Sequence, residues 1–151
     1  MRFTTTTIAG LFLIVCAASA QELHVSQVPD AVVKAFKSTY PDVATPEWER
    51  EGEYYEAEFD VHGIENSVRF SAEGSIVATE VEMSISDIPS SIITFIKRSY
   101  AGYEIGEGAK VTTSEGTFFE VEIVGKGKEY ELLFDAEGHP VKREMEDGDD
   151  D

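Results

Sequence analysis

The segment VPDAVVKAFKSTY at residues 28–40 decides the fold, because it returns sixty residues later as IPSSIITFIKRSY at 88–100. In the first copy, apolar residues recur every four positions, at Val28, Val32 and Phe36, and the second copy repeats this spacing. A period close to 3.6 places such residues on one face of a helix. Each segment also has proline at its second position, which suits the first helical turn. The two segments therefore predict equivalent amphipathic helices.

After each predicted helix the apolar period changes from four to two. YEAEF at 55–59 recurs as FEVEI at 119–123, and FSAEG at 70–74 recurs as FDAEG at 134–138, both at an offset of 64. Alternation of apolar and acidic residues is typical of strands with one buried face, and Ala-Glu-Gly is typical of a tight turn. Since the helices repeat at 60 and the strands at 64, about four residues are inserted between helix and sheet in the second copy.

The repeated pattern predicts an α+β fold in which each copy is one helix followed by a four-stranded antiparallel sheet. One helix covers only one face of such a sheet, so the other face is left to solvent or to a partner. The predicted repeats span 21–85 and 86–145. Their strands are expected at 45–51, 55–61, 64–70 and 75–85, and at 110–114, 117–124, 129–135 and 140–145.

Residues 1–20 have the pattern of a secretory signal peptide. Arg2 precedes an apolar run that is short for a membrane span, and Ala18-Ser19-Ala20 provides the small residues of a cleavage site. Lipidation of Cys16 is the alternative, although Val15 stands where a small residue is expected. Cleavage removes the single cysteine, so no disulfide or thiol chemistry remains. At the other end, 146–151 is an acidic tail expected to be disordered.

The composition is strongly acidic, with 30 Asp and Glu against 12 Lys and Arg. The predicted leader holds one of the cations and no acid, so the remaining residues carry a formal charge of −19. Such a charge excludes nucleic acid and anionic membrane surfaces as partners, because like charges repel. It permits a cation or a protein with a basic surface. Solubility outside the cytoplasm is the simpler explanation of the charge.

Three features occur together along 26–145: the proline-led segments that end in tyrosine, the YEAEF strand, and the Phe-x-x-x-Gly turns. In this combination the chain resembles the PepSY-like, β-lactamase-inhibitor-like proteins secreted by Bacteroidetes. The resemblance implies that the two sheets join into one curved sheet with both helices on one face. It also implies a periplasmic or extracellular, non-catalytic binding module, such as an inhibitor of a peptidase or another envelope protein. Some relatives are described as calcium-regulated.

The residues that carry enzyme chemistry are missing or isolated. The three histidines, His24, His62 and His139, lie in a linker or beside turn glycines, and no Gly-x-Ser-x-Gly elbow is present. Paired carboxylates are plentiful, but on an open sheet face they should keep ordinary pKa values, whereas a general acid needs a raised one. The sequence therefore predicts a protein that is not an enzyme.

Calcium is the one cofactor that the acidic strands suggest. Neighbouring strands could bring outward-facing glutamates together, and calcium accepts several carboxylate oxygens with tolerant geometry. The candidate ligands are Glu56, Glu58, Glu120 and Glu122. No EF-hand loop is present, and a solvated acidic face is the simpler alternative.

Large apolar residues interrupt the acidic side of the predicted strands. Tyr54 shares its side with Glu56, and Phe118, its equivalent 64 residues on, shares its side with Glu120. Aromatic residues on an uncovered acidic face are typical of protein interfaces and would favour a basic partner. The expected partner-binding residues are Trp48, Tyr54, Phe118 and Leu133. The alternative is that these side chains pack over an edge or between the halves, and the sequence leaves the oligomeric state open.

Overall fold

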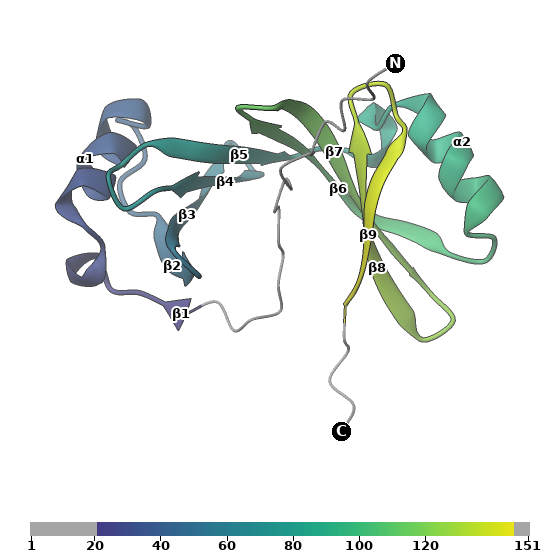
Figure 1. The fold of residues 1–151 in the computed structure, drawn as a ribbon, viewed down its shortest axis with the longest axis horizontal. Coiled ribbons are helices and arrows are strands. Elements are labelled where there is room, and N and C mark those ends of the chain that lie inside the picture. Colours follow the sequence, from purple (N-terminus) through teal and green to yellow (C-terminus); the bar gives the residue numbers. More distant parts are fainter. Residues whose placement is uncertain (1–20, 147–151) are drawn as a thin grey trace, which may run out of the picture.

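The computed structural model describes residues 21–146, which form one nine-stranded sheet, two α-helices and two 3-10 turns (Figure 1). The predicted signal peptide and all of the predicted acidic tail beyond Glu146 lie outside the described residues. In chain order the elements are β1 (Gln21–Glu22), η1 (Val25–Gln27), α1 (Asp30–Thr39), β2 (Glu47–Glu51), β3 (Tyr54–Val61), β4 (Ile64–Phe70), β5 (Ile76–Glu82), η2 (Ile85–Asp87), α2 (Ser90–Ser99), β6 (Glu104–Thr113), β7 (Gly116–Gly125), β8 (Lys128–Asp135) and β9 (Pro140–Glu146).

The strands are ordered β1 to β9 as in the sequence, and every neighbouring pair is antiparallel. Strand β5 pairs with β6 through Ala78–Glu82 and Ala109–Thr113, so the four strands after α1 and the four after α2 belong to one sheet. The short strand β1, which the sequence did not predict, covers part of the edge of β2. The α+β class and the single joined sheet are confirmed.

Both predicted helices form, and each begins one residue after its proline. Pro29 and Pro89 are the N-cap residues of α1 and α2, where a missing N–H leaves no helical hydrogen bond unmade. Tyr40 and Tyr100 are the C-cap residues, and the backbone N–H of each donates to the carbonyl four residues earlier. Within the described chain, neither helix is long and apolar enough to cross a membrane.

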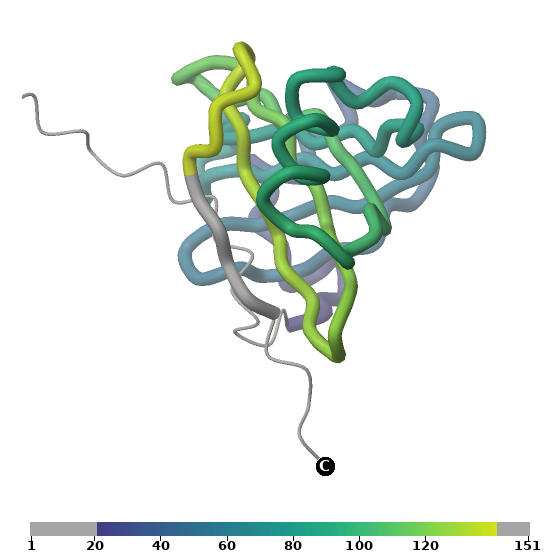
Figure 2. Tube along the Cα trace, turned by 90° about the vertical axis from the view of Figure 1, so that its right-hand side faces the viewer, coloured from purple at the N-terminus to yellow at the C-terminus, as the bar shows by residue number. Residues whose placement is uncertain are grey.

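Both helices lie on the same side of the sheet, which bends so that α1 and α2 are on its outside (Figure 1). Figure 2, seen from the α2 end, places α2 in front of the strands and the first half of the chain behind them. Each helix covers its own apolar cluster. One cluster contains Leu23, Val28, Val32, Phe36, Trp48, Ala57, Phe59, Val68 and Phe70, and the other contains Ile88, Ile92, Ile96, Val121, Ile123, Leu132 and Phe134.

The Phe-x-x-x-Gly repeat has a direct structural cause. Its glycines, Gly74 and Gly138, have φ angles of 85° and 84°, a region that other residues rarely adopt. Each turn also presses against the first turn of its helix: a Cβ at Gly74 would lie 2.6 Å from the carbonyl oxygen of Ala31. Glycine therefore serves two purposes at both positions, since it permits the turn and lets the turn approach the helix.

The unequal segment between helix and sheet also has a visible consequence. Strand β6 has ten residues and β2 has five, and the pairing of β6 with β7 shifts register between Ile105 and Gly108. The sequence predicted only 110–114 for this strand. The alternation is broken in 104–109 by two glycines and by the bulge, which absorbs part of the inserted length.

Candidate functional site

The side of the sheet that faces away from the helices, called the inner face below, gathers most of the predicted site residues. The register pairs Glu56 with Arg69, Glu80 with Val111 and Glu120 with Leu133, which places these side chains on one side of six strands. By the same alternation the inner face includes Glu47, Glu49, Glu51, Tyr54, Glu56, Glu58, Glu65, Ser67, Arg69, Ala78, Glu80, Glu82, Ala109, Val111, Phe118, Glu120, Glu122, Glu131 and Leu133.

Tyr54 and Phe118 lie on the inner face as predicted, and both side chains are partly exposed. Leu133 is also on this face, but it is only 5% exposed, so the expectation of an exposed anchor was wrong. The sheet bends over its own middle, where Val111 is fully buried as well. Leu133 therefore belongs to the interior of the bend.

The expectation for Trp48 was wrong for a different reason. Trp48 pairs with Ala57, so it points to the helix side, where it is 4% exposed. Its ring packs edge-on against Phe36, with the ring centroids 5.4 Å apart. This residue is part of the first core and is unavailable to a partner.

Arg69 is the only cation among the described side chains of the inner face. It forms ion pairs with Glu51 and with Glu56, the latter at 3.4 Å between Nη2 and Oε2. The hydroxyl of Ser67 donates a second hydrogen bond to Glu56, at 2.7 Å. Arg69 and Glu56 are 8% and 7% exposed, which makes this a buried ion pair at the centre of the first half.

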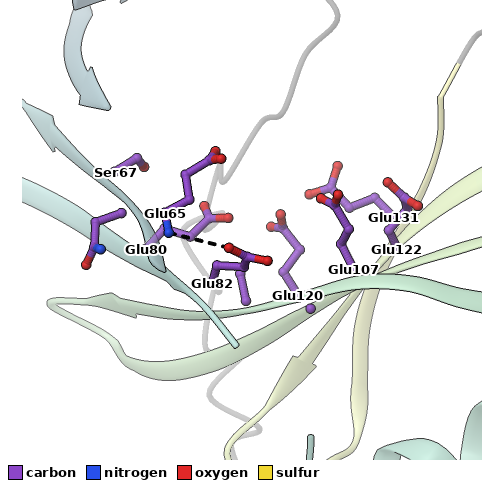
Figure 3. A pocket seen from close by; sticks show the side chains of 11 residues that line it. Glu65, Ser67, Glu80, Glu82, Glu107, Glu120, Glu122 and Glu131 are labelled. Carbon is purple, nitrogen blue, oxygen red and sulfur yellow. Dashed lines mark hydrogen bonds between the residues drawn. The ribbon is translucent and has the colours of Figure 1, made fainter. Parts of the chain in front are cut away.

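A pocket of about 220 Å³ opens on the inner face where the two halves meet. Figure 3 shows Glu65, Glu80 and Glu82 on one side and Glu107, Glu120, Glu122 and Glu131 on the other. The remaining lining residues are Asn66, Ser67, Gly108 and Ala109, none of which carries a charge. Seven glutamates thus meet at the joint between the halves.

Three carboxyl groups of the inner face, those of Glu58, Glu80 and Glu120, do not have the ordinary pKa values that the sequence predicted. Burial, together with the negative charges of the nearby Glu49 and Glu56, raises the pKa of Glu58 to about 7. Burial also raises the pKa of Glu80 and, by more, that of Glu120, which additionally forms a hydrogen bond with the carboxyl group of Glu131. An open face would have hydrated these groups, but the bend removes part of the water.

The predicted calcium ligands do not come together. Glu56 and Glu58 lie on β3, whereas Glu120 and Glu122 lie on β7, with three strands between them. Glu56 is also held by Arg69 and Ser67. Within residues 21–141, no group of three or more acidic, histidine or cysteine side chains is arranged to hold a metal ion. Calcium binding stays a prediction that the geometry does not support.

The histidines are exposed turn residues, as the sequence predicted. His24 caps η1 by accepting a hydrogen bond from the backbone of Ser26, and His139 lies 3.1 Å from Asp135 within one turn. His62 occupies a left-handed turn position with a φ angle of 58°. None of the three lies on the inner face.

Among the inner-face residues that escaped the sequence analysis as site residues are Arg69, Glu80 and Glu131. The signal was present, because strand alternation places all three on the acidic side. What the alternation could not show is that residues from β4, β5 and β8 converge in one pocket. That convergence depends on the curvature of the sheet.

The comparisons with known proteins agree with this architecture. Two segments, 15–78 and 53–142, match the family described as "Putative beta-lactamase-inhibitor-like, PepSY-like". These segments span most of the chain, which therefore belongs to this PepSY-like family. No functionally curated protein matches the sequence significantly.

Solved structures from Bacteroides share the fold. A BLIP-like protein from Bacteroides fragilis is 29% identical, with a TM-score of 0.65 over 82% of this chain and 91% of that one. A DUF2874 family protein from Bacteroides uniformis is 21% identical, with a TM-score of 0.70 over 78% and 88%. A structure described as a "putative periplasmic" protein from Bacteroides eggerthii gives the same four values.

Proposed function

We propose that this protein is a non-catalytic binding module of the bacterial envelope whose inner face holds a protein partner with a basic surface. The observation that carries the proposal is the composition of that face. Its described side chains combine one buried cation, many carboxylates and the half-exposed rings of Tyr54 and Phe118. Aromatic anchors surrounded by one sign of charge are typical of faces that select a partner of the opposite charge.

Inhibition of a peptidase or another envelope enzyme is the most specific form of this function. The family description names an inhibitor-like protein, and the Bacteroides fragilis structure is described as BLIP-like. A concave sheet face is suited to this role, because it can enclose a protruding loop and exclude water from the contact. The signal-peptide pattern of residues 1–20 and the periplasmic description of one neighbour support a location in the periplasm or outside the cell.

An enzymatic function has little support from the same residues. The carboxyl groups with raised pKa values, Glu80 and Glu120, lie among other carboxyl groups, and no imidazole lies on the inner face. A hydrolytic acid/base pair needs one carboxyl kept protonated and another kept ionised on opposite sides of a substrate. Here the neighbouring carboxyl groups raise both pKa values, and Arg69 lowers both, so nothing sets the two groups apart as one acid and one base.

The proposal can be tested by capturing partners from the native envelope with the wild-type chain and two charge variants. Glu82→Lys reverses an exposed charge on the inner face, and Glu115→Lys reverses an exposed charge in the turn between β6 and β7. We expect a basic protein that is retained by wild type and Glu115→Lys, lost with Glu82→Lys, and released by salt. A partner that binds all three chains equally would contradict the use of the inner face.

A further inference from the structure

Strand β1 lies along the edge of β2, at the N-terminal end of the sheet (Figure 1). Gln21 is the first residue of β1 and is paired with Arg50. Two residues on, the N–H of Leu23 donates to the carbonyl oxygen of Trp48 at 2.7 Å, and the side chain of Leu23 is 8% exposed within the first apolar cluster. The segment is thus anchored at Leu23, whereas Gln21 is exposed to solvent.

Gln21 is also the residue that follows the predicted cleavage site. Cleavage after Ala20 would make Gln21 the N-terminal residue, and β1 would stay complete because it begins there. An N-terminal glutamine has a reactivity that an internal glutamine lacks, because its free α-amino nitrogen can reach the amide carbon of its own side chain through a five-membered ring. The exposed position of Gln21 leaves room for that ring.

We propose that the exported chain begins at Gln21, that this residue is cyclised to pyroglutamate, and that the lactam protects β1 from aminopeptidases. In the reaction the α-amino nitrogen forms a bond to Cδ, the bond between Cδ and Nε2 breaks, and ammonia leaves with one proton of the α-amino group. One amide is exchanged for another within a single residue, so the step needs no oxidant, reductant or second substrate. The modification does not depend on what the inner face binds.

A blocked N-terminus would keep β1 in place on the sheet. The hydrogen bond from Leu23 to Trp48 sets the phase of the antiparallel ladder, so the next hydrogen-bonded pair is Gln21 with Arg50. Cyclisation leaves the carbonyl group of Gln21 unchanged, opposite the N–H of Arg50. Removal of Gln21 and Glu22 would instead leave the edge of β2 uncovered, and an uncovered edge invites pairing with other chains.

The first test is the intact mass of the protein purified from the native envelope. We expect the mass of residues 21–151 less one ammonia, and pyroglutamyl peptidase should remove one residue and leave Glu22 with a free amine. A chain that begins at Gln21 and retains its ammonia would overturn the cyclisation. A chain that still contains Cys16, with or without a lipid, would overturn the cleavage.

Two exported variants separate the chemistry of Gln21 from export itself. Gln21→Ala has no side-chain amide to attack, so it should carry a free amine and lose residues to an added aminopeptidase that wild type resists. Trimming should stop before Leu23, because the fold holds the N–H and the side chain of that residue. Glu22→Ala keeps Gln21 and should lack one ammonia, as wild type does. A blocked amine in Gln21→Ala, or equally fast trimming of wild type, would refute the proposal.

The protection of the sheet edge can be measured separately by hydrogen exchange. In a chain that begins at Leu23, the backbone amide of Arg50 should exchange at least about tenfold faster than in the cyclised chain, because Gln21 no longer covers it. The amide of Glu49 faces β3 by the same alternation and is the control. Equal exchange of the Arg50 amide in both chains would overturn the protective role of the lactam.

Discussion

The two halves of the molecule have equivalent apolar cores that are filled by different side chains. In the first half the helix contributes an aromatic ring, Phe36, which packs against Tyr40, Trp48 and Phe59 at centroid distances of 5.3–5.4 Å. In the second half the equivalent helix position is Ile96, and the rings come from Phe95, Tyr100, Tyr103, Tyr130 and Phe134. The two cores bury equivalent positions, but different residues supply the aromatic rings that fill them.

The comparison teaches that the repeat constrains the interior more tightly than the surface. Core side chains must fill a closed space at high density, so a change at one position is compensated at a neighbour. The buried ion pairs of Arg69 have no counterpart in the other half, where Leu133 stands at the equivalent position. Features that belong to one half alone are therefore the best candidates for specific recognition.

The largest expected effect comes from emptying each core at its equivalent helix position. Phe36→Ala should cost about 3–5 kcal/mol of unfolding free energy and Ile96→Ala about 2–5 kcal/mol. Because β5 and β6 join the halves in one sheet, each variant should still unfold in a single transition in urea. Lys37→Ala, on the exposed side of α1, is the control. Two separate transitions would show that the halves fold independently.

The turn glycines give the next largest effect. Gly74→Ala and Gly138→Ala should each cost more than about 1 kcal/mol, because alanine is strained at positive φ and its Cβ would press on the helix. Gly63→Ala, at a φ of 82° with open space around it, introduces the backbone strain without a contact for the new Cβ. Thermal unfolding of the three variants should rank Gly63→Ala as the mildest. Equal losses at all three sites would mean that contact with the helix contributes nothing.

The unfolding free energy should depend on pH through the carboxyl groups at the joint between the halves. Glu80 and Glu120 have pKa values raised above the ordinary 4.5, so the folded chain binds more protons than the unfolded chain. Their contribution to stability is complete below about pH 4.5 and is lost as the pH rises through neutrality. The unfolding free energy of Glu80→Gln with Glu120→Gln should therefore fall less steeply between pH 5 and 8. A double variant that keeps the wild-type slope would contradict this prediction.

The aromatic pair of the inner face should affect binding more than stability. Tyr54→Ser and Phe118→Ser, at half-exposed positions, should each cost less than about 1 kcal/mol of stability, whereas Trp48→Ser removes a buried ring and should cost about 3 kcal/mol or more. Circular dichroism melts measure the first effect and capture of the envelope partner measures the second. If both inner-face variants capture the partner as well as wild type does, Tyr54 and Phe118 are not part of the binding surface.

Calcium should produce the smallest change. Because the pairs Glu56 with Glu58 and Glu120 with Glu122 lie on separate strands, 1 mM Ca²⁺ should raise the Tm by less than about 2 °C. Magnesium at the same concentration provides the control for screening of charge. A saturable heat of calcium binding by calorimetry would contradict this expectation and favour the metal site that the acidic strands suggested.

Much of the fold could be predicted because its signals are local. The stripe through Val32 and Phe36 and the alternation around Ala57 each follow from the geometry of a single element. Strand β1 could not be predicted, since two residues carry no period, and neither could the bulge near Gly108. For the site, alternation placed Tyr54, Phe118 and the glutamates correctly on one face. It failed for Trp48, whose side became clear only through its pairing with Ala57.

By itself the sequence determined the two helices, most of the strands, their order and the acidic side of the sheet, because these depend on the spacing of neighbouring residues. Only the tertiary structure decided what the bend of the sheet encloses: it buries Leu133 and brings Glu80, Glu120 and Glu131 into one pocket. The physical reason is that curvature sums small twists over nine strands. It brings together side chains whose separation along the chain says nothing of their distance in space.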